Sequence, residues 1–250
     1  MTGRWQAADA ARSLHVPGAD DDKYTRGVVG VRTGSDAYPG AAVLGVEAAW
    51  RAGTGMVRYL GPSRAADLVL ARRPETVTAP GRVQAWVIGS GTDAGTRTLA
   101  ETAELAHLLD GPDPVVVDAG ALDLAPGARA PRVVTPHARE HDRLRRLLGL
   151  PPVEDVADVR ADAAAETAAV LGAVVLLKGA VTLVADPGGD VRQVTTGTGW
   201  LATAGTGDVL AGCLGAVVAG VVAHAASVPS PVALADAAAT AAWLHGTAAR

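Results

Sequence analysis

Short β-branched runs alternate with alanine-rich segments along almost the whole chain, and this alternation limits the folds that the chain can adopt. Strands are expected at residues 28–32, 56–60, 85–88, 114–117, 132–134, 174–177, 181–185 and 191–194. Helices are expected at residues 41–51, 64–72, 96–109, 139–148, 156–171, 207–225 and 231–248. This order favours an α/β fold in which a mainly parallel central sheet carries helices on both faces. The last two strands flank a Pro-Gly-Gly-Asp turn and are expected to form a hairpin.

The domain organisation expected from the sequence is simple. A chain of 250 residues fits one large α/β domain, and it contains no internal repeat or long low-complexity linker. Residues 1–22 are polar, include an acidic run at positions 20–22, and are expected to form an N-terminal arm or linker. Residues 23–250 are expected to form the single domain.

Composition limits the partners and the compartment that we expect. The net charge is −4 and 19% of the residues are charged, with no basic run that indicates a nucleic-acid partner. Cys213 is the only cysteine, so an internal disulfide is impossible and a reducing compartment fits. The first residues lack the apolar core of a signal peptide. We expect a cytoplasmic protein that forms a homo-oligomer.

The segment 209–226 is apolar and about as long as a minimal membrane span. It consists mostly of Ala, Gly and Val, it contains His224, and no aromatic or basic anchors flank it. These features favour a buried core helix over a membrane helix, and no membrane partner is expected. Cys213 lies within this segment without an evident partner base, which favours a core position over a nucleophile.

Several of the expected strands end in residues that are suited to ligand binding. Gly89 and Gly91, Asp118, Thr135 and His137, and Lys178 each follow a strand directly. In open α/β sheets ligands bind beyond the carboxyl ends of the strands, so a site is expected at this edge. Asp118 is either a carboxylate in this cleft or a turn residue, and the sequence leaves both interpretations open.

A glycine-rich loop at residues 203–207 runs directly into the apolar helix. Glycines let a backbone approach a ligand closely, and the first amides of a helix are unpaired donors that suit phosphate. Asp208 follows the loop and either caps the helix or accepts a proton from an attacking hydroxyl. Lys178 ends a buried strand, so its ammonium group either contacts a phosphate or extends to solvent. Together, loop and lysine favour a phosphate site.

Other familiar motifs fit the sequence less well. The glycines at 89, 91 and 95 have the spacing GxGxxxG, which is not the Rossmann pattern, and no Walker A loop precedes Lys178. His137, Glu140 and His141 match the H-x-x-E-H pattern of zinc proteases, but such short patterns arise often by chance. We interpret His137 as a cleft residue at a strand end and His141 as a surface residue.

Six motifs in this order resemble those of the ADP/ATP-dependent NAD(P)H-hydrate dehydratases, over about residues 23–248. They are GSDAYPGAA at 34–42, GSG at 89–91, VDAGAL at 117–122, TPHARE at 135–140, KGAVT at 178–182 and TGTGWLATAGTGDVL at 196–210. The resemblance implies a ribokinase-like fold. It also implies use of ADP or ATP, with Mg²⁺, to remove water from (6S)-hydrated NADH or NADPH. Many members of the family carry an epimerase domain before this region.

The resemblance also implies roles for individual residues. Asp208 would be the catalytic base that deprotonates the hydroxyl of the hydrate. The hydrated nicotinamide nucleotide would be contacted by Tyr38, Ala41, Gly91, His137 and Asp208. The adenine nucleotide would be contacted by Lys178, Gly179, Ala180, Val181, Thr182, Gly205, Thr206 and Gly207. The family often has Asp at the position of Gly120, and Asn at the positions of Val194 and Thr198.

Three other functions compete with this interpretation. A ribokinase-like kinase of a small alcohol would share Asp208 and the glycine loop, but not the YPGAA and TPHxxE stretches. A nucleotide-binding regulator would bind ligand without turnover. A zinc hydrolase would use the H-x-x-E-H pattern. Neither the choice between ADP and ATP nor that between hydrated NADH and hydrated NADPH follows from the sequence.

Overall fold

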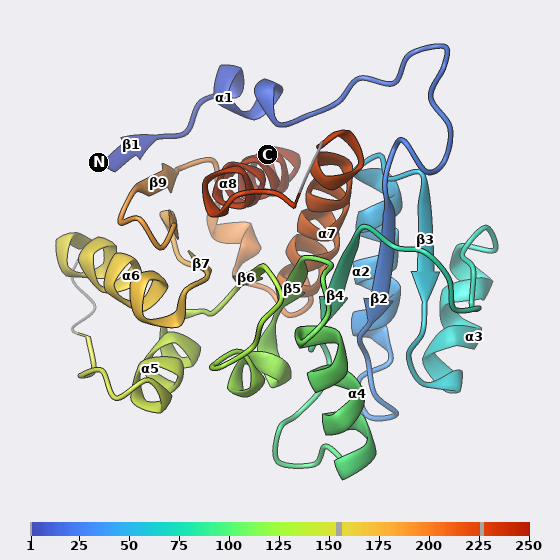
Figure 1. Cartoon of the computed structure of the whole chain (residues 1–250), viewed down its shortest axis with the longest axis horizontal. Coiled ribbons are helices and arrows are strands. Elements are labelled where there is room, and N and C mark those ends of the chain that lie inside the picture. Colours follow the sequence, from blue (N-terminus) through green and yellow to red (C-terminus); the bar gives the residue numbers. More distant parts are fainter. Residues whose placement is uncertain (1, 154–156, 226–227) are drawn as a thin grey trace.

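The computed structural model describes residues 2–153, 157–225 and 228–250 and contains one large sheet (Figure 1). Its strand order is β1-β9-β8-β7-β6-β5-β4-β2-β3. The strands are β1 (Thr2–Arg4), β2 (Val28–Arg32), β3 (Met56–Tyr59), β4 (Ala85–Ile88), β5 (Val115–Val117), β6 (Arg132–Val134), β7 (Val174–Leu177), β8 (Thr182–Ala185) and β9 (Val191–Val194). Strands β2 to β7 pair in parallel, and β8 runs antiparallel to both β7 and β9. The mainly parallel sheet and the final hairpin are therefore confirmed.

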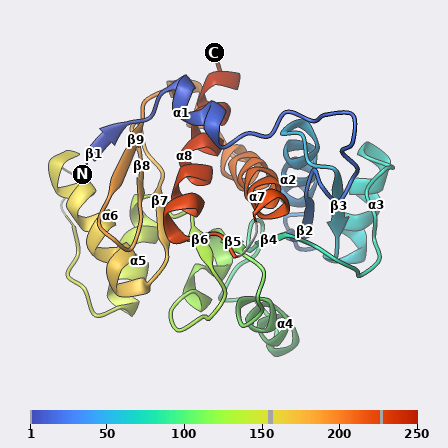
Figure 2. The same cartoon turned by 45° about the horizontal axis from the view of Figure 1, so that its top comes forward.

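Helices cover both faces of the sheet. They are α1 (Ala7–Arg12), α2 (Gly40–Arg51), α3 (Ser63–Arg72), α4 (Leu99–Leu109), the 3₁₀ helix η1 (Ala119–Leu124), α5 (Ala138–Leu147), α6 (Ala157–Leu171), the 3₁₀ helix η2 (Gly199–Leu201), α7 (Thr206–His224) and α8 (Pro231–Ala248). Figure 2 shows α2, α7 and α8 side by side. One core lies between the sheet and these three helices, and a second lies on the other face, beneath α4 and α6.

Alternation along the strands separates these two cores. In β7, Val174 and Leu176 belong to the core beneath α7 and α8, whereas Val175 and Leu177 belong to the opposite core. Successive strand side chains point to opposite faces, so a strand that is apolar at every position is buried on both sides. This is why the β-branched runs of the sequence predicted the strand bounds so well.

The apolar helix α7 lies in the centre of the molecule. Its residues Leu210–Ala219 are buried, and a Cβ atom at Gly212 would lie 2.0 Å from the carbonyl oxygen of Gly45 on α2. Glycine at this position lets the two helices pack closely. By length and composition α7 could also cross a membrane, but its burial fits the expected core helix. Cys213 is buried there as predicted, and burial raises the pKa of its thiol to about 12.

The N-terminal residues lie against the domain rather than apart from it. Strand β1 extends the sheet by pairing in parallel with β9, and Ala10 on α1 is buried. Residues 13–27 then cross the top of the molecule in Figure 1 to reach β2. Neither β1 nor α1 was expected from the polar composition of this segment.

Several helix bounds differ from those expected by one residue, and the start of α4 differs by three. Helix α4 begins at Leu99 rather than at residue 96, because the Thr98 side chain accepts a hydrogen bond from the amide of Glu101 and caps the helix. Residues 156 and 226, where an expected helix begins and the long apolar segment ends, lie outside the described residues.

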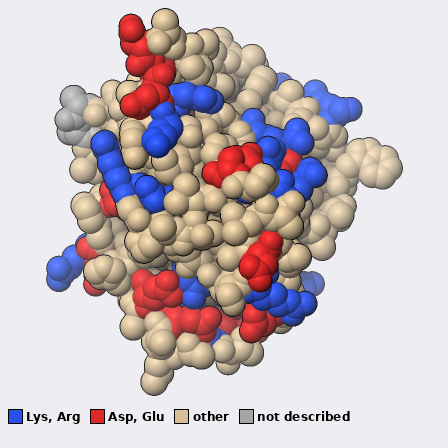
Figure 3. Space-filling view, turned by 90° about the vertical axis from the view of Figure 1, so that its right-hand side faces the viewer, with Lys and Arg blue, Asp and Glu red and all other residues tan. Residues whose placement is uncertain are grey.

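The surface carries mixed charge. Acidic and basic side chains alternate on the face shown in Figure 3. An example among the ion pairs is Glu47 of α2, which contacts Arg51, Arg72 and Arg73.

Candidate active site

Left-handed backbone follows the carboxyl ends of three strands. Gly34 follows β2 with a φ of 78°, and Gly89 and Gly91 follow β4 with φ values of 95° and 66°. Ala119, directly after β5, has a φ of 45° and is the only non-glycine residue with positive φ in the described part of the chain. Residues held in such conformations often occur at functional sites. Ala119 therefore marks the edge that the sequence indicated.

Three residues expected to contact the nicotinamide nucleotide come together at this edge. A Cβ atom at Gly91 would lie 2.4 Å from the Cβ atom of Ala41 and 2.9 Å from the carbonyl oxygen of Tyr38. Ala41 is buried in the first turn of α2, whereas the Tyr38 side chain is 62% exposed. A side chain at position 91 would therefore displace the loop that carries Tyr38.

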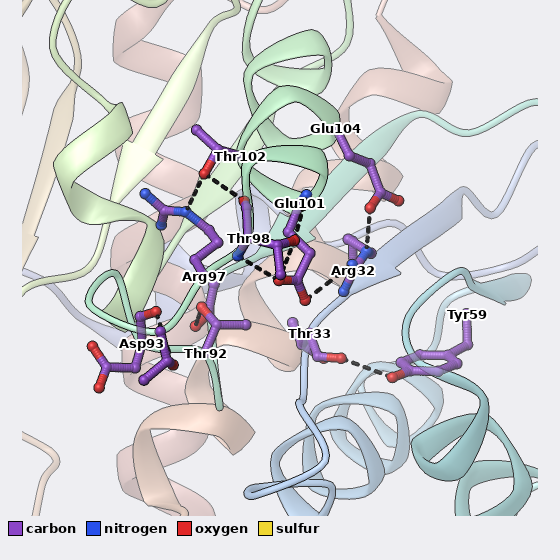
Figure 4. A network of polar contacts seen from close by, with 12 residues as sticks. Arg32, Thr33, Tyr59, Thr92, Asp93, Arg97, Thr98, Glu101, Thr102 and Glu104 are labelled. Carbon is purple, nitrogen blue, oxygen red and sulfur yellow. Dashed lines mark hydrogen bonds and ion pairs between the residues drawn. The ribbon is translucent and has the colours of Figure 1, made fainter.

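The loop from Gly89 to Thr98 is held by the polar network in Figure 4. Arg97 donates to the carbonyl oxygen of Gly120 and pairs with Asp123 at 2.6 Å. On the other side, the buried Arg32 at the end of β2 pairs with Glu104 of α4 at 2.9 Å. These contacts join the end of the loop and α4 to η1 and to β2.

The centre of the site is the buried carboxylate of Asp118. It accepts hydrogen bonds from Ser90 Oγ at 2.8 Å, from Thr135 Oγ1 at 2.7 Å and from Lys178 Nζ at 3.0 Å. The donors come from the ends of β4 and β6, which flank β5 in the sheet, and of β7, which lies next to β6. Asp118 is thus a carboxylate of the cleft, the first of the two interpretations that the sequence left open.

Lys178 points into the site and not to solvent. Its Nζ lies 3.0 Å from Asp118 and 3.7 Å from Glu140, and its side chain is only 21% exposed. Burial alone would lower the pKa of Lys178, but the charges of Asp118, Glu140 and Asp208 outweigh that effect and raise it. Lys178 is therefore a permanent cation in this cleft.

Asp208 lies in the first turn of α7 and is half-buried. Within residues 2–153, 157–225 and 228–250, no hydrogen bond or ion pair to its carboxylate is found. Burial raises the pKa of Asp208, the Asp118 charge raises it further, and Lys178 opposes them, with a result of about 6. A carboxylate without partners and with a pKa near neutrality is suited to act as a general base.

The two histidines of the H-x-x-E-H pattern have different environments. His137 caps α5, accepts from the amide of Glu140 through Nδ1 at 3.3 Å, and faces the cleft as expected. His141 was expected at the surface, and this was wrong: it is buried, with Nε2 at 2.9 Å from Thr167 Oγ1. The Thr167 hydroxyl donates to Ala163 O, so His141 must donate to it. That nitrogen cannot bind zinc at the same time.

A cavity of about 470 Å³ opens beside Lys178. Most of the residues expected to bind the adenine nucleotide line it, namely Lys178, Gly179, Ala180, Thr182, Thr206 and Gly207. Val181 and Gly205 do not line it, although Gly205, with a φ of 92°, shapes the turn into α7. Its size fits the range of small-molecule sites.

Two residues of this cavity were not assigned from the sequence. The Thr198 hydroxyl is buried there and has no hydrogen-bond partner among the described residues, so it is available to a ligand. His245 on α8 lines the cavity next to Thr206 at the start of α7; burial lowers its pKa, and a hydrogen bond to the Thr206 backbone opposes this effect. Residue 245 is remote from every motif in the sequence, so only the packing of α8 could reveal it.

A second cavity, of about 530 Å³, lies on the other side of Glu140. Its lining combines apolar residues with five charged ones, namely Asp93, Asp123, Glu140, Arg143 and Arg146. Gly120 also lines it, and a Cβ atom there would lie 2.2 Å from the carbonyl oxygen of Thr92. The Asp that is frequent at this position in the family does not fit this backbone arrangement.

Comparison with known proteins identifies the family. A family model described as NAD(P)H-hydrate dehydratase matches residues 29–250. This chain belongs to the NAD(P)H-hydrate dehydratase family. The match confirms the family expected from the six motifs.

Relatives agree with this membership. The chain is 49% identical to the bifunctional NAD(P)H-hydrate repair enzyme Nnr of Mycobacterium tuberculosis over 227 residues, which cover 86% of this chain and 46% of that protein. It thus spans about half the length of the bifunctional relatives. It is also 35% identical to the ADP-dependent (S)-NAD(P)H-hydrate dehydratase of Neisseria meningitidis, over 92% of this chain and 78% of that protein.

Solved structures agree with the fold. The ADP/ATP-dependent NAD(P)H-hydrate dehydratase of Bacillus subtilis, co-crystallised with ATP and Mg²⁺, has a TM-score of 0.80 and 30% identity, and the match covers 98% of this chain and 87% of that one. A ribokinase-like superfamily protein of Enterococcus faecalis shares the fold at 22% identity. The expected ribokinase-like class is confirmed.

Proposed function

We propose that this chain uses ADP or ATP to dehydrate (6S)-hydrated NADH or NADPH to the reduced cofactor. Family membership supports the reaction class. The observation that carries the proposal is the unpaired, half-buried Asp208 carboxylate, placed at the start of α7 beside Lys178 and the glycine loop. A base, a cation and a helix N-terminus are the groups that phosphoryl transfer to a hydroxyl requires.

The nucleotide occupies the cavity beside Lys178, and its terminal phosphate points to the first amides of α7. A Cβ atom at Gly207 would lie 3.5 Å from Lys178 Nζ, so glycine keeps the space between the loop and the lysine open. The helix N-terminus and the ammonium group both stabilise negative charge there. Thr198 offers its free hydroxyl from the opposite wall.

The hydrate occupies the side of Asp208 that faces Gly91, Ala41 and His137. Asp208 takes the proton of the substrate hydroxyl, and the oxygen attacks the terminal phosphorus, releasing AMP from ADP or ADP from ATP. The C–O bond then breaks as inorganic phosphate leaves, and the neighbouring ring carbon loses a proton. The product is NADH or NADPH. Asp208 performs the step for which its pKa of about 6 is suited.

The residues present fit a Mg²⁺ ion at the phosphates. Mg²⁺ prefers oxygen ligands and is usually held by one or two carboxylates together with substrate phosphates. Glu140 lies beside Lys178, and its Oε2 accepts from the amide of His137 at 2.8 Å, which orients the carboxylate. Bound there, Mg²⁺ would neutralise charge on the transferred phosphoryl group. Asp118 is less available, since three donors already surround it.

The test is recovery of reduced-nicotinamide absorbance from hydrated NADH and, separately, hydrated NADPH. The purified chain receives Mg²⁺ with ADP or with ATP, and we compare it with Asp208→Asn and with Asp162→Asn, which alters an exposed carboxylate on α6. We expect nucleotide-dependent recovery in the parent and in Asp162→Asn and none in Asp208→Asn. Full turnover by Asp208→Asn would exclude the proposed base.

The same assay separates this function from the alternative. A small-alcohol kinase would return no absorbance with either nucleotide, yet would transfer phosphate to an alcohol acceptor.

We also propose that the protein acts in the cytoplasm. The presence of a single thiol, that of the buried Cys213, supports a reducing compartment.

A further inference from the structure

Three side chains with metal-binding atoms meet where the N-terminal segment crosses the end of α7. His15 and Asp21 belong to that segment, and His224 is the last residue of α7. One ligand atom from each lies within 4.8 Å of the other two. Position 224 is far from positions 15 and 21 in the sequence, and none of the three belongs to one of the six motifs.

Two of the three groups, His224 and Asp21, are oriented by hydrogen bonds to the backbone, and His15 is held by its contact with Asp21. The His224 Nδ1 lies 2.9 Å from the carbonyl oxygen of Gly220, a pure acceptor, so Nδ1 carries the proton and Nε2 keeps its lone pair. The Asp21 carboxylate accepts from the amide of Gly18 at 2.7 Å. A backbone carbonyl on the far nitrogen of a histidine is the usual support for a metal ligand.

The spacing of the ligand atoms is close to that of a tetrahedral site. Nε2 of His15 lies 2.7 Å from Asp21 Oδ2, and Nε2 of His224 lies 4.0 Å from Asp21 Oδ1. Zinc with bonds of about 2.0–2.1 Å separates its ligands by about 3.3 Å, which lies between these values. The two imidazole rings are already in contact, with centroids 3.7 Å apart and planes tilted by 32°. Small side-chain rotations would place all three atoms around one ion.

The charges around the three groups and the types of ligand atom limit which ion can bind. One positive charge lies nearby: Arg26 lines the same small cavity as both histidines, and its Nη2 donates to Gly53 O at 3.0 Å. Asp21 is the only carboxylate among the three ligands. Two imidazoles and one carboxylate suit a borderline divalent ion such as Zn²⁺ and discriminate against Mg²⁺, which prefers oxygen.

We propose that His15, Asp21 and His224 form a site for a divalent ion of the zinc class. By binding all three residues, the ion connects the N-terminal segment to α7. Three protein ligands leave a fourth position to water. From Asp208 to His224 the helix rises about 24 Å, so this site is separate from the phosphates at the other end of α7. The ion therefore stabilises the fold and takes no part in the reaction proposed above.

The experiment uses the full chain without an affinity tag, stripped with a chelator, and titrated with Zn²⁺ by calorimetry and with Co²⁺ by visible absorption. We expect one Zn²⁺ per chain with a dissociation constant of about 1 μM or lower, and the absorption of tetrahedral Co²⁺. His15→Ala and His224→Ala should each weaken binding more than about 100-fold, beyond the loss expected for an outer-shell partner. The matched control, His107→Ala on α4, should bind as the parent does.

Thermal unfolding provides an independent readout. Zn²⁺ should raise the melting temperature of the parent and of His107→Ala, and leave that of His15→Ala unchanged. His15 lies on an exposed segment, so its variant folds even if His224→Ala does not. The proposal is wrong if the folded parent shows no saturable Zn²⁺ binding, or if His15→Ala and Asp21→Asn bind Zn²⁺ as tightly as the parent. Loss of dehydratase activity with Zn²⁺ binding intact would contradict the proposed function alone.

Discussion

Two carboxylates at the same edge of the sheet have opposite environments. Asp118, at the end of β5, is buried and accepts from three side chains, whereas Asp208, at the start of α7, has no such partner in the described chain. A buried polar group that is fully hydrogen-bonded stabilises its surroundings, while an unpaired one is costly and retained for function. The difference fits the proposed function, in which Asp118 holds the site together and Asp208 is the base.

Replacing Asp208 should lower turnover more than any other change described below, and it should raise the stability of the fold. Loss of a general base typically costs about 10²- to 10⁴-fold in rate, and we expect Asp208→Asn to fall in the upper part of that range. The folded-state pKa of about 6 exceeds the unfolded value of 3.8, so the charged form destabilises the fold above pH 6. Asp208→Asn should therefore raise the free energy of unfolding by about 1 kcal/mol at pH 8. This value is reduced for the partial exposure of the group.

Denaturant unfolding at several pH values measures this gain. It should stay nearly constant down to about pH 6 and shrink between pH 6 and pH 4, because the parent carboxyl becomes protonated in the folded state and loses its charge. If Asp208→Asn proves less stable than the parent at pH 8, the carboxylate has a structural partner and the contrast with Asp118 fails.

Replacing Asp118 should lower both stability and turnover. Asp118→Asn leaves Lys178 with Glu140 as its nearest carboxylate and removes an acceptor for Ser90 or Thr135. We expect the free energy of unfolding to fall by about 2–3 kcal/mol. This is less than the loss of about 3–5 kcal/mol that follows when a buried ion pair is fully broken. Turnover should fall roughly 10- to 100-fold as Lys178 shifts, since small misplacements near the chemistry are costly. A variant of unchanged stability would show that Asp118 is not the anchor.

The pH profile tests whether the two carboxylates interact. In the parent, kcat/KM should rise with pH to a plateau with an apparent pKa of about 6, and should fall about tenfold per pH unit below it. The Asp118 charge contributes to the raised pKa of Asp208, so in Asp118→Asn the profile should move to lower pH. An identical profile in the two proteins would mean that the titrating group is not Asp208, or that Asp118 does not act on it.

The smallest effect is expected at the free hydroxyl of the nucleotide cavity. Thr198→Val keeps the shape of the side chain and removes the hydrogen bond that Thr198 would make to a nucleotide. A net loss of about 0.5–1.5 kcal/mol corresponds to roughly a 2- to 10-fold increase in the dissociation constant of ADP or ATP, measured by calorimetry. Thr247→Val, an exposed change on α8, is the control. Tighter binding by Thr198→Val would place the nucleotide away from this wall.

Much of the fold followed from the sequence because it depends on local patterns. The β-branched runs predicted the bounds of β2, β4, β6, β7 and β9 without error. The glycine loop before an apolar helix predicted the start of α7 to within one residue. Strand period, turn residues and helix caps act over a few neighbouring residues, so one sequence contains them fully.

The tertiary structure decided the contacts between segments that are distant in the chain. His141 can be buried because Thr167, on another helix, accepts its hydrogen bond, and β1 is a strand because β9 offers an edge. The role of Asp118 depends on donors 28, 17 and 60 residues away. The sequence alone determined which residues could do chemistry at the sheet edge. Only folding decided which carboxylate would be surrounded by donors and which would be left free, because burial and charge depend on every segment packed around the group.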